Sequence, residues 1–322
     1  MARLLAAIAN TQIPPVAAIF LTTGGLFALN KETAEQQATR RSRGEPPLVR
    51  PVNVGCCILK WALQVVAREP GTRQAAEGLG PIQRGLGQKR GVEACAHLIR
   101  ALHIKGYTVA LNDFKNGFND FHRQAMMDAV QRECPACTNL MNYYYATDAA
   151  CFCMANGRIK ILWSSQGSRM GCVLGSFGFD LTVKPIYEQM AKDFPGAVLR
   201  ALTDDLIAAF PPPEAGECIF DTITRYYGRL ETAALKIGLK TNIPKRAVML
   251  PEQGPRPTEE KQRGESGGRR PCCQQHAEGK KGPALPPGTK IKAETWGEHS
   301  EKVTKNWKGS RWQGPQSERR PS

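Results

Sequence analysis

The chain has 322 residues, of which 41% are hydrophobic, so it is long enough to bury one large core or two ordinary ones. Its 44 Lys and Arg residues against 29 Asp and Glu residues give a formal net charge of +15, which favours polyanionic partners but also fits a basic soluble protein. No stretch reaches the ~20 consecutive apolar residues that a spanning helix needs, so we expect no membrane insertion.

The first hundred residues predict short helices and a strand pair. Pro14 and Pro15 interrupt the N-terminal apolar stretch, which predicts two short helices and argues against a signal peptide. Two strand-like runs, LFALNK and 49–54, flank a polar segment at 31–47, which we expect to be an exposed loop or a helical insertion. Apolar residues at helical spacing predict helices at 56–68 and 92–104, and the Gly-, Arg- and Gln-rich segment between them, 70–91, is expected to be a basic loop.

The next part of the chain carries the clearest strand signals. The apolar run 107–112 predicts a buried strand that ends at Asp113, and the pair Asn156-Gly157 predicts a hairpin turn. Two further strands are expected on either side of an adjacent acid pair. The remaining predictions are strands at 197–203 and 206–210 and helices at 121–134, 170–190 and 218–238.

The composition changes after about residue 250. Residues 251–322 are rich in Pro, Gly, Gln, Glu, Lys and Arg and have almost no aliphatic clusters. Such a segment buries too little apolar surface to offset its ordering entropy. We therefore predict an ordered unit of roughly 250 residues followed by a disordered basic tail at 251–322.

Acidic residues at strand ends are the candidate chemistry. An apolar strand leads into Asp113, and Asp204-Asp205 lies between two apolar strands, so a hairpin would point these carboxylates at one spot. Acids in apolar runs are costly unless they are compensated, and a divalent cation compensates them well. Two metal ions ~3.5–4 Å apart would support phosphoryl transfer. The alternative is that the acids are solvent-exposed turn residues.

The order of these motifs resembles the reverse transcriptases of non-LTR retrotransposons over residues 1–250. The segments that carry the resemblance are FALNK, LVRPVNVG, DFKNGF, QGSRMGCVLGSFGFDL, LTDDL and GLKTNIPK. The resemblance implies an α+β fold with the fingers and palm of a right-hand polymerase, in which an antiparallel palm sheet is backed by helices. It implies a fingers-like region at 1–104 and a palm at 105–250.

The same resemblance implies a role for individual residues. Asp113, Asp204 and Asp205 would hold Mg²⁺, with Mn²⁺ as a substitute, and Lys245 would be a general acid at the pyrophosphate. The implied nucleotide-binding residues are Lys31 and Arg50 near the triphosphate, Phe118 as a steric gate against the 2′-hydroxyl, and Gln166-Gly167 under the template and nucleotide. The implied function is RNA-directed DNA polymerisation, with a primed RNA or DNA template and dNTPs as partners.

The chain also departs from the family pattern. Leu202 stands where the family usually has Tyr or Phe, and Ser168-Arg169 replaces a commoner Asp-Pro after Gln-Gly. No thumb is recognisable after Lys245. The chain therefore resembles a fragment of such an enzyme.

Cysteines raise a separate question. Several of the eleven cysteines lie in apolar segments, where they behave as small core residues, so we expect a reducing compartment, nuclear or cytoplasmic. Cys134, Cys137, Cys151 and Cys153 supply four thiols, but their spacing is imperfect for a tetrahedral site. We expect buried thiols and no zinc.

Two alternatives to a reverse transcriptase remain. One is a non-catalytic nucleic-acid-binding remnant of a retroelement, which would tolerate loss of Asp204. The other is an RNA-dependent RNA polymerase, against which Phe118 argues because a ribonucleotide polymerase needs room for the 2′-hydroxyl.

Overall fold

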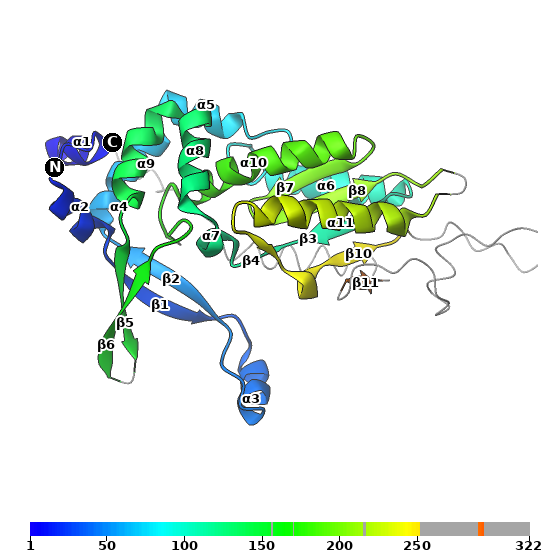
Figure 1. The fold of residues 1–322 in the computed structure, drawn as a ribbon, viewed down its shortest axis with the longest axis horizontal. Helices are drawn as coiled ribbons and strands as arrows, with labels where there is room; N and C mark the ends of the chain where they lie inside the picture. The colour runs from blue at the N-terminus through cyan, green and yellow to red at the C-terminus, as the bar shows by residue number, and fades with distance from the viewer. Residues whose placement is uncertain (156, 170, 215–216, 252–288, 293–322) are drawn as a thin grey trace, which may run out of the picture.

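The computed structural model describes residues 1–155, 157–169, 171–214, 217–251 and 289–292. Figure 1 shows a body of helices and one sheet, from which two strand hairpins project on one side. The antiparallel sheets backed by helices confirm the predicted α+β architecture. Within the described parts of the chain, none of the helices combines the length and the apolar character needed to span a membrane.

The two hairpins form a four-stranded sheet of order β2-β1-β5-β6. β1 and β2 pair antiparallel along seven residue pairs, and β5 and β6 do the same, which confirms the hairpin that the pair Asn156-Gly157 predicts. A short parallel contact of β1 with β5 joins the hairpins. The strands are β1 (Gly24–Asn30), β2 (Val49–Gly55), β5 (Ala149–Ala155) and β6 (Arg158–Ser164).

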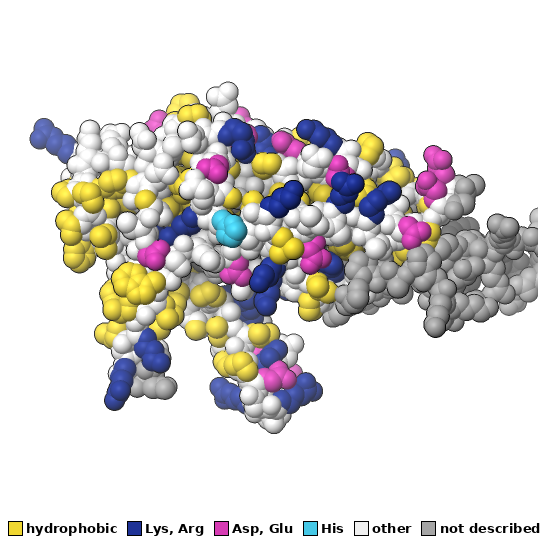
Figure 2. All heavy atoms as spheres, viewed as in Figure 1, with side chains coloured by type: hydrophobic (Ala, Val, Ile, Leu, Met, Phe, Trp, Pro, Cys, Tyr) yellow, Lys and Arg dark blue, Asp and Glu magenta, His cyan; other side chains and the backbone are white. Residues whose placement is uncertain are grey.

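A helical insertion lies at the tip of the first hairpin. α3 (Ala34–Ser42) occupies most of the segment expected to be a loop or helical insertion. It begins at Thr33, whose hydroxyl accepts from the backbone of Gln36 while the Gln36 side chain accepts from the backbone of Thr33. Figure 2 shows Lys and Arg side chains at the ends of both projections.

The second sheet has five strands in the order β11-β10-β3-β8-β7. The pairs β10–β3, β3–β8 and β8–β7 are antiparallel, and the short β11 joins β10 in parallel. The strands are β3 (Thr108–Asn112), β7 (Val198–Leu202), β8 (Asp205–Phe210), β10 (Ala247–Met249) and β11 (Lys290–Lys292).

Both faces of this sheet are covered, which explains why its strands read as near-continuous apolar runs. Successive residues of a strand point to opposite faces. Val109 accordingly packs in a small cluster with Cys95 and Ile99 of α6 (Gly91–Ile104). Ala110 belongs to the larger core on the other face. That core includes residues of α10 (Gly175–Asp193) and α11 (Ile219–Leu235), which lie side by side in Figure 1.

The remaining elements are short and connect these layers. They are α1 (Ala2–Ala9), α2 (Pro15–Thr22), α4 (Cys57–Ala67), α5 (Pro70–Glu77), β4 (Phe114–Lys115), α7 (Gly117–Asp120), α8 (Arg123–Glu133), α9 (Pro135–Tyr145), β9 (Lys240–Thr241) and the 3-10 turn at Ile243–Lys245.

Two observations bear on the predicted layout. The expected basic loop at 70–91 is wrong in its first part, because Pro70 occupies a first-turn position that suits proline and starts α5. The division expected at residue 104 stays a prediction, and the sheets pair as follows. The β5–β6 hairpin joins the sheet of β1 and β2, whereas α6 packs on β3 and β8.

The predicted tail at 251–322 lies outside the described residues except for 251 and 289–292. Three of these, Lys290–Lys292, form β11 beside β10, which the composition did not predict.

Candidate active site

The three candidate acids meet at one end of the five-stranded sheet. β3 and β8 are adjacent and antiparallel, with Asn112 opposite Leu206, so Asp113 leaves β3 where Asp205 enters β8. Neighbouring strands lie ≈ 4.8 Å apart, which brings the two acids to the same place. Asp204 belongs to the two-residue turn between β7 and β8, where Leu202 pairs with Asp205. The hairpin predicted from the sequence is therefore present.

The three carboxylates repel one another electrostatically. Burial raises the pKa of Asp204, and the negative charge of Asp113 raises it further, whereas Lys245 and Arg50 oppose the shift. Burial, Asp204 and Asp113 together raise the pKa of Asp205 to about 7, although its side chain reaches the surface. Mutual repulsion of this kind favours a proton or a bound cation at the cluster.

This repulsion predicts a pH-dependent stability. A carboxylate whose folded pKa lies above its unfolded value contributes stability below the unfolded pKa of about 3.9, and that contribution is lost as the pH rises through the folded value. We therefore expect the melting temperature of the metal-free protein to fall between about pH 5 and about pH 8. Asp205→Asn should flatten this fall, as measured by thermal unfolding in a chelating buffer. An equal fall in both proteins would contradict the raised pKa of Asp205.

Asp113 is held by two residues from the segment that follows α11. Lys245 forms an ion pair with the Asp113 carboxylate, and the side-chain amide of Asn242 donates to the same oxygen at 3.0 Å. The backbone N–H of Asn242 also donates to the Asp113 carbonyl at 2.7 Å. The Lys245 side chain is 66% exposed, so the pair is easily broken. The resemblance pointed to Lys245, but the sequence reasoning missed Asn242.

Phe118 lies beside the acids on the short helix α7. A Cβ built on the preceding Gly117 would lie 3.4 Å from the Cβ of Asp204, which shows how close this helix is to the acid turn. The Phe118 ring packs against Phe179 of α10, with ring centroids 5.0 Å apart. This packing fixes the Phe118 side chain, which the resemblance predicts to be the steric gate.

Gln166 and Gly167 lie directly against α7. The backbone N–H of Gly167 donates to the Phe121 carbonyl at 2.8 Å, and that of Ser168 donates to the Phe118 carbonyl at 2.7 Å. Gly167 has φ +57°, and a Cβ there would lie 2.3 Å from the Phe118 carbonyl oxygen. The glycine is therefore required for the close approach of the two segments, and the Gln166 side chain is left exposed.

Arg123 of α8 holds this segment in place, and the sequence analysis gave no role to it. Its guanidinium donates to the carbonyls of Gly167 at 3.1 Å and Ser164 at 2.5 Å. It also reaches the carbonyl of Tyr145 at 3.4 Å. Nothing in the sequence around Arg123 distinguishes it from a solvent-exposed arginine, so its role could not be predicted.

A cleft of about 320 Å³ lies next to this segment, between the two hairpins. Its lining includes Leu26 and Asn53 of the first hairpin, Trp163 of the second, and Gln166 and Arg169. The acids do not line it. The cleft is therefore separate from the acid cluster, and Asn119 of α7 and Gln166 lie on its wall.

The structure places the two expected phosphate-binding cations differently. The charge of Arg50 of β2 opposes the rise in the pKa of Asp204, but no ion pair among the described residues joins Arg50 to an acid. Lys31 follows β1 and has an exposed side chain, and its backbone N–H donates to the Leu48 carbonyl at 2.9 Å. The structure does not bring the Lys31 side chain into contact with the acids.

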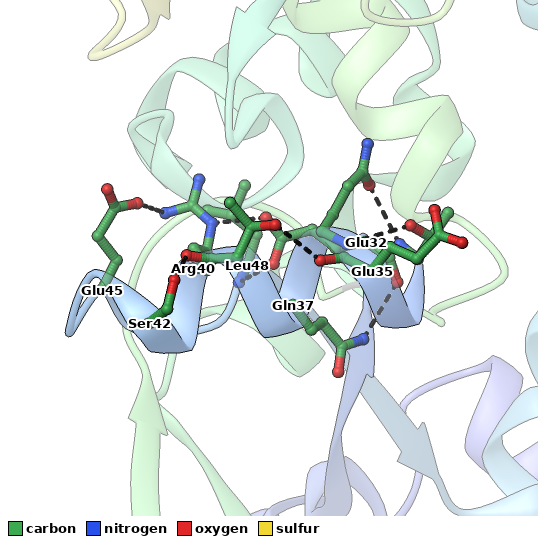
Figure 3. A network of polar contacts seen from close by, with 10 residues as sticks. Glu32, Glu35, Gln37, Arg40, Ser42, Glu45 and Leu48 are labelled. Carbon is green, nitrogen blue, oxygen red and sulfur yellow. Dashed lines mark hydrogen bonds and ion pairs between the residues drawn. The ribbon is translucent and has the colours of Figure 1, made fainter.

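Figure 3 shows the polar network around α3, which includes Glu32, the residue that follows Lys31 in the chain. Glu32 accepts from Arg40 of α3 at 2.5 Å, and Arg40 also pairs with Glu45 at 2.6 Å. The second oxygen of Glu32 accepts from the backbone of Leu48 at 3.3 Å. The hydrogen bond from Arg40 lowers the pKa of Glu32. These contacts tie α3 to both strands of its hairpin.

The sequence predicts Mg²⁺ at these acids, and their spacing limits how an ion could bind there. No three His, Cys, Asp or Glu side chains within the described ranges stand close enough to hold one metal ion. Magnesium is often bound by only one or two carboxylates, with substrate phosphates and water as its other ligands. Asp204 and Asp205, whose pKa values are raised by their acidic neighbours, would supply carboxylates for that mode of binding.

The four cysteines considered for zinc lie on different elements. Cys134 and Cys137 are buried at the junction of α8 and α9, where the Cys137 sulfur lies 3.2 Å from the Thr72 hydroxyl. Burial raises the pKa of the Cys137 thiol to about 12. Cys151 and Cys153 lie on β5, and all four are free thiols.

A structure of apo telomerase from Candida tropicalis is similar to this chain, with a TM-score of 0.50 and 11% identity over 75% of this chain and 46% of that chain. The fold is reverse-transcriptase-like. The reverse-transcriptase-like region spans about half the length of the telomerase chains that it matches.

Two further telomerase structures are similar to the same region. Candida tropicalis apo telomerase truncated from its C-terminal domain gives a TM-score of 0.46 at 12% identity, covering 73% of this chain and 51% of that one. Candida albicans telomerase in complex with a TWJ fragment of telomeric RNA gives a TM-score of 0.46 at 10% identity. The match covers 72% of this chain and 42% of that one. No protein-family model matches the sequence. No curated protein matches it either.

Proposed function

We propose that this chain is the fingers and palm of an RNA-directed DNA polymerase of the non-LTR retrotransposon type. The observation that carries the proposal is the convergence of Asp113, Asp204 and Asp205, with Lys245 paired to Asp113, at one end of a reverse-transcriptase-like sheet. The partners would be a primed RNA or DNA template and dNTPs, in the nucleus or the cytoplasm and away from membranes.

The proposed metal ligands are Asp113 and Asp204, with Asp205 assisting. Bound Mg²⁺, or Mn²⁺ in its place, would activate the primer 3′-hydroxyl and stabilise the leaving oxygen. Asn242 fixes the orientation of the Asp113 carboxylate by donating to it. A ligand held in advance in this way loses little entropy when a cation arrives.

The cations around the acids would handle the triphosphate. The charge of Arg50 already acts on Asp204, and its guanidinium would bind phosphate oxygens of a nucleotide held there. Lys245, now paired with Asp113, would turn to the pyrophosphate and donate a proton to it as it leaves. Lys31 would join them only if the hairpin that carries it closed over the nucleotide.

Phe118 would select deoxynucleotides. Its ring is fixed by Phe179, so it cannot move aside for a 2′-hydroxyl. We expect Phe118→Ala to raise incorporation of ribonucleotides relative to deoxynucleotides by about 100-fold, the scale on which shape discriminates a single hydroxyl. Single-nucleotide incorporation with each dNTP and NTP pair would measure it. An unchanged ratio would show that Phe118 is not the gate.

The proposed function is tested by primer extension with Mg²⁺ and dNTPs on RNA and DNA templates, together with primer–template binding by fluorescence anisotropy. Extension on the RNA template supports a reverse transcriptase. Binding without extension would favour a non-catalytic nucleic-acid-binding remnant. Extension with NTPs alone would favour an RNA polymerase and refute the proposed role of Phe118.

A further inference from the structure

Gln83 is a buried amide that none of the catalytic roles above uses. It lies between α5 and α6, and only 2% of its surface is exposed. The backbone on each side of it pairs with the edge strand β7. The N–H of Ala201 donates to the Ile82 carbonyl, and the N–H of Arg84 donates to the Ala201 carbonyl, both at 2.8 Å. This pairing places the Gln83 side chain beside the turn that carries the acids.

The oxygen and the nitrogen of the Gln83 amide each make two hydrogen bonds. Its oxygen accepts from the backbone N–H groups of Thr203 and Gly85, each at 2.9 Å. Its nitrogen donates to the Thr203 carbonyl at 3.2 Å and to Asp180 of α10 at 3.1 Å. A primary amide offers two donors and an oxygen that accepts twice, so its hydrogen-bonding capacity is filled.

The turn needs this support because Thr203 has an unfavourable backbone. Its φ is +61°, which is rare for a β-branched residue. Such conformations persist where the surroundings over-determine them, and they concentrate at active sites. Gln83 binds both the N–H and the carbonyl of Thr203, and the Tyr187 hydroxyl reaches the same carbonyl at 3.4 Å.

Asp180 connects this arrangement to the helix behind the sheet. It is almost fully buried on α10, and its second carboxylate oxygen has no hydrogen-bond partner among the described residues. Gln83 thus joins α10 to the peptide that precedes Asp204, in addition to the direct contact from Tyr187. Gly85 makes room for it, since a Cβ there would lie 2.9 Å from the Thr203 hydroxyl.

We propose that Gln83 is a positioning residue that sets the geometry of Asp204 and Asp205 for a divalent cation. The inference rests on the proposed metal-dependent function. Gln83 touches neither acid, and it acts through the backbone of Thr203. Losing it would let the turn relax toward ordinary backbone angles and move the carboxylate of Asp204 relative to Asp113.

The test compares Mn²⁺ binding and primer extension in the full chain. The variants are Gln83→Leu, which removes all four hydrogen bonds, and Gln83→Asn, which is too short to reach Thr203 and Asp180 together. Gln88→Leu is the control, because Gln88 lies in the same segment but its amide donates to the Glu77 carbonyl, away from the turn. Free Mn²⁺ is measured by electron paramagnetic resonance, which needs no turnover.

We expect both Gln83 variants to lose roughly 10–100-fold in Mn²⁺ affinity and in kcat, as removal of outer-sphere partners usually does, with the KM for dNTP nearly unchanged. Gln88→Leu should match the wild type in Mn²⁺ affinity, in kcat and in the KM for dNTP. All measurements are made below the melting temperature of each variant. If Gln83 had a purely structural role, its loss would lower the melting temperature but leave the Mn²⁺ affinity of the folded protein unchanged.

The outcomes separate the two proposals. Wild-type Mn²⁺ affinity in a folded Gln83 variant would overturn the positioning role, as would a wild type that binds no Mn²⁺. If Gln83→Leu does not fold, the folded Gln83→Asn variant decides by the same comparison. Weakened Mn²⁺ binding in the variants without primer extension by the wild type would keep the positioning role and refute the polymerase.

Discussion

Replacing Asp204 with Asn should lower primer extension by about 1,000-fold or more, a loss of about 4 kcal/mol in transition-state stabilisation. Asn keeps the size of the side chain but removes the charge that would hold a metal ion. Because Asp204 raises the pKa of Asp205, its removal should also relieve repulsion within the cluster. The variant should therefore be at least as stable as the wild type at neutral pH while extension is lost.

The control for this experiment is Asp221→Asn, the same substitution at an exposed position on α11. It should extend primers at the wild-type rate, and primer–template binding should survive in both variants. Single-turnover extension with saturating dNTP measures the chemical step. Wild-type extension by Asp204→Asn would remove Asp204 from the metal site and with it the central element of the proposed mechanism.

Gly167→Ala should destabilise the protein by about 3 kcal/mol, near the upper end for single substitutions. Its φ of +57° disfavours any side chain, and the added Cβ would lie 2.3 Å from the Phe118 carbonyl oxygen. The atoms in the way belong to the backbone of α7, so no flexible side chain can move aside. The measurement is urea unfolding followed by circular dichroism.

Gly44→Ala separates the cost of the positive φ from the cost of the steric contact with α7. Gly44 has φ +68° but no atom within 4 Å of a built Cβ, so only the cost of the backbone conformation remains. That cost is about 1 kcal/mol. Equal destabilisation by the two variants would show that α7 can move away from Gly167. In that case Phe118 would not be fixed by this contact.

The acid cluster could be predicted from the sequence because it lies at the ends of local apolar patterns. Asp113 follows one apolar strand, and Asp204-Asp205 lies between two more, so the ends of the apolar runs predict where the carboxylates lie. The β5–β6 hairpin was equally predictable from its Asn-Gly turn signal. Patterns of this kind depend on a few neighbouring residues, which a single sequence displays directly.

The residues that support the cluster carried no such signal. Gln83 lies in a segment predicted to be a basic loop, yet it bonds Thr203, 120 residues away. Asn242 is 129 residues from Asp113, and the Arg123 guanidinium reaches the Gly167 carbonyl 44 residues later in the chain. The amides and the guanidinium in these contacts look the same in sequence whether they face solvent or a buried backbone.

The sequence by itself determined the strands, the hairpins and the candidate carboxylates, because hydrophobic periodicity and turn chemistry act over a few residues. Only the tertiary structure decided which cations join the acids, which glycine allows α7 and the 164–169 segment to touch, and which amide holds the acid turn. Those choices follow from how the layers pack, and packing brings together groups whose separation along the chain gives no sign that they meet.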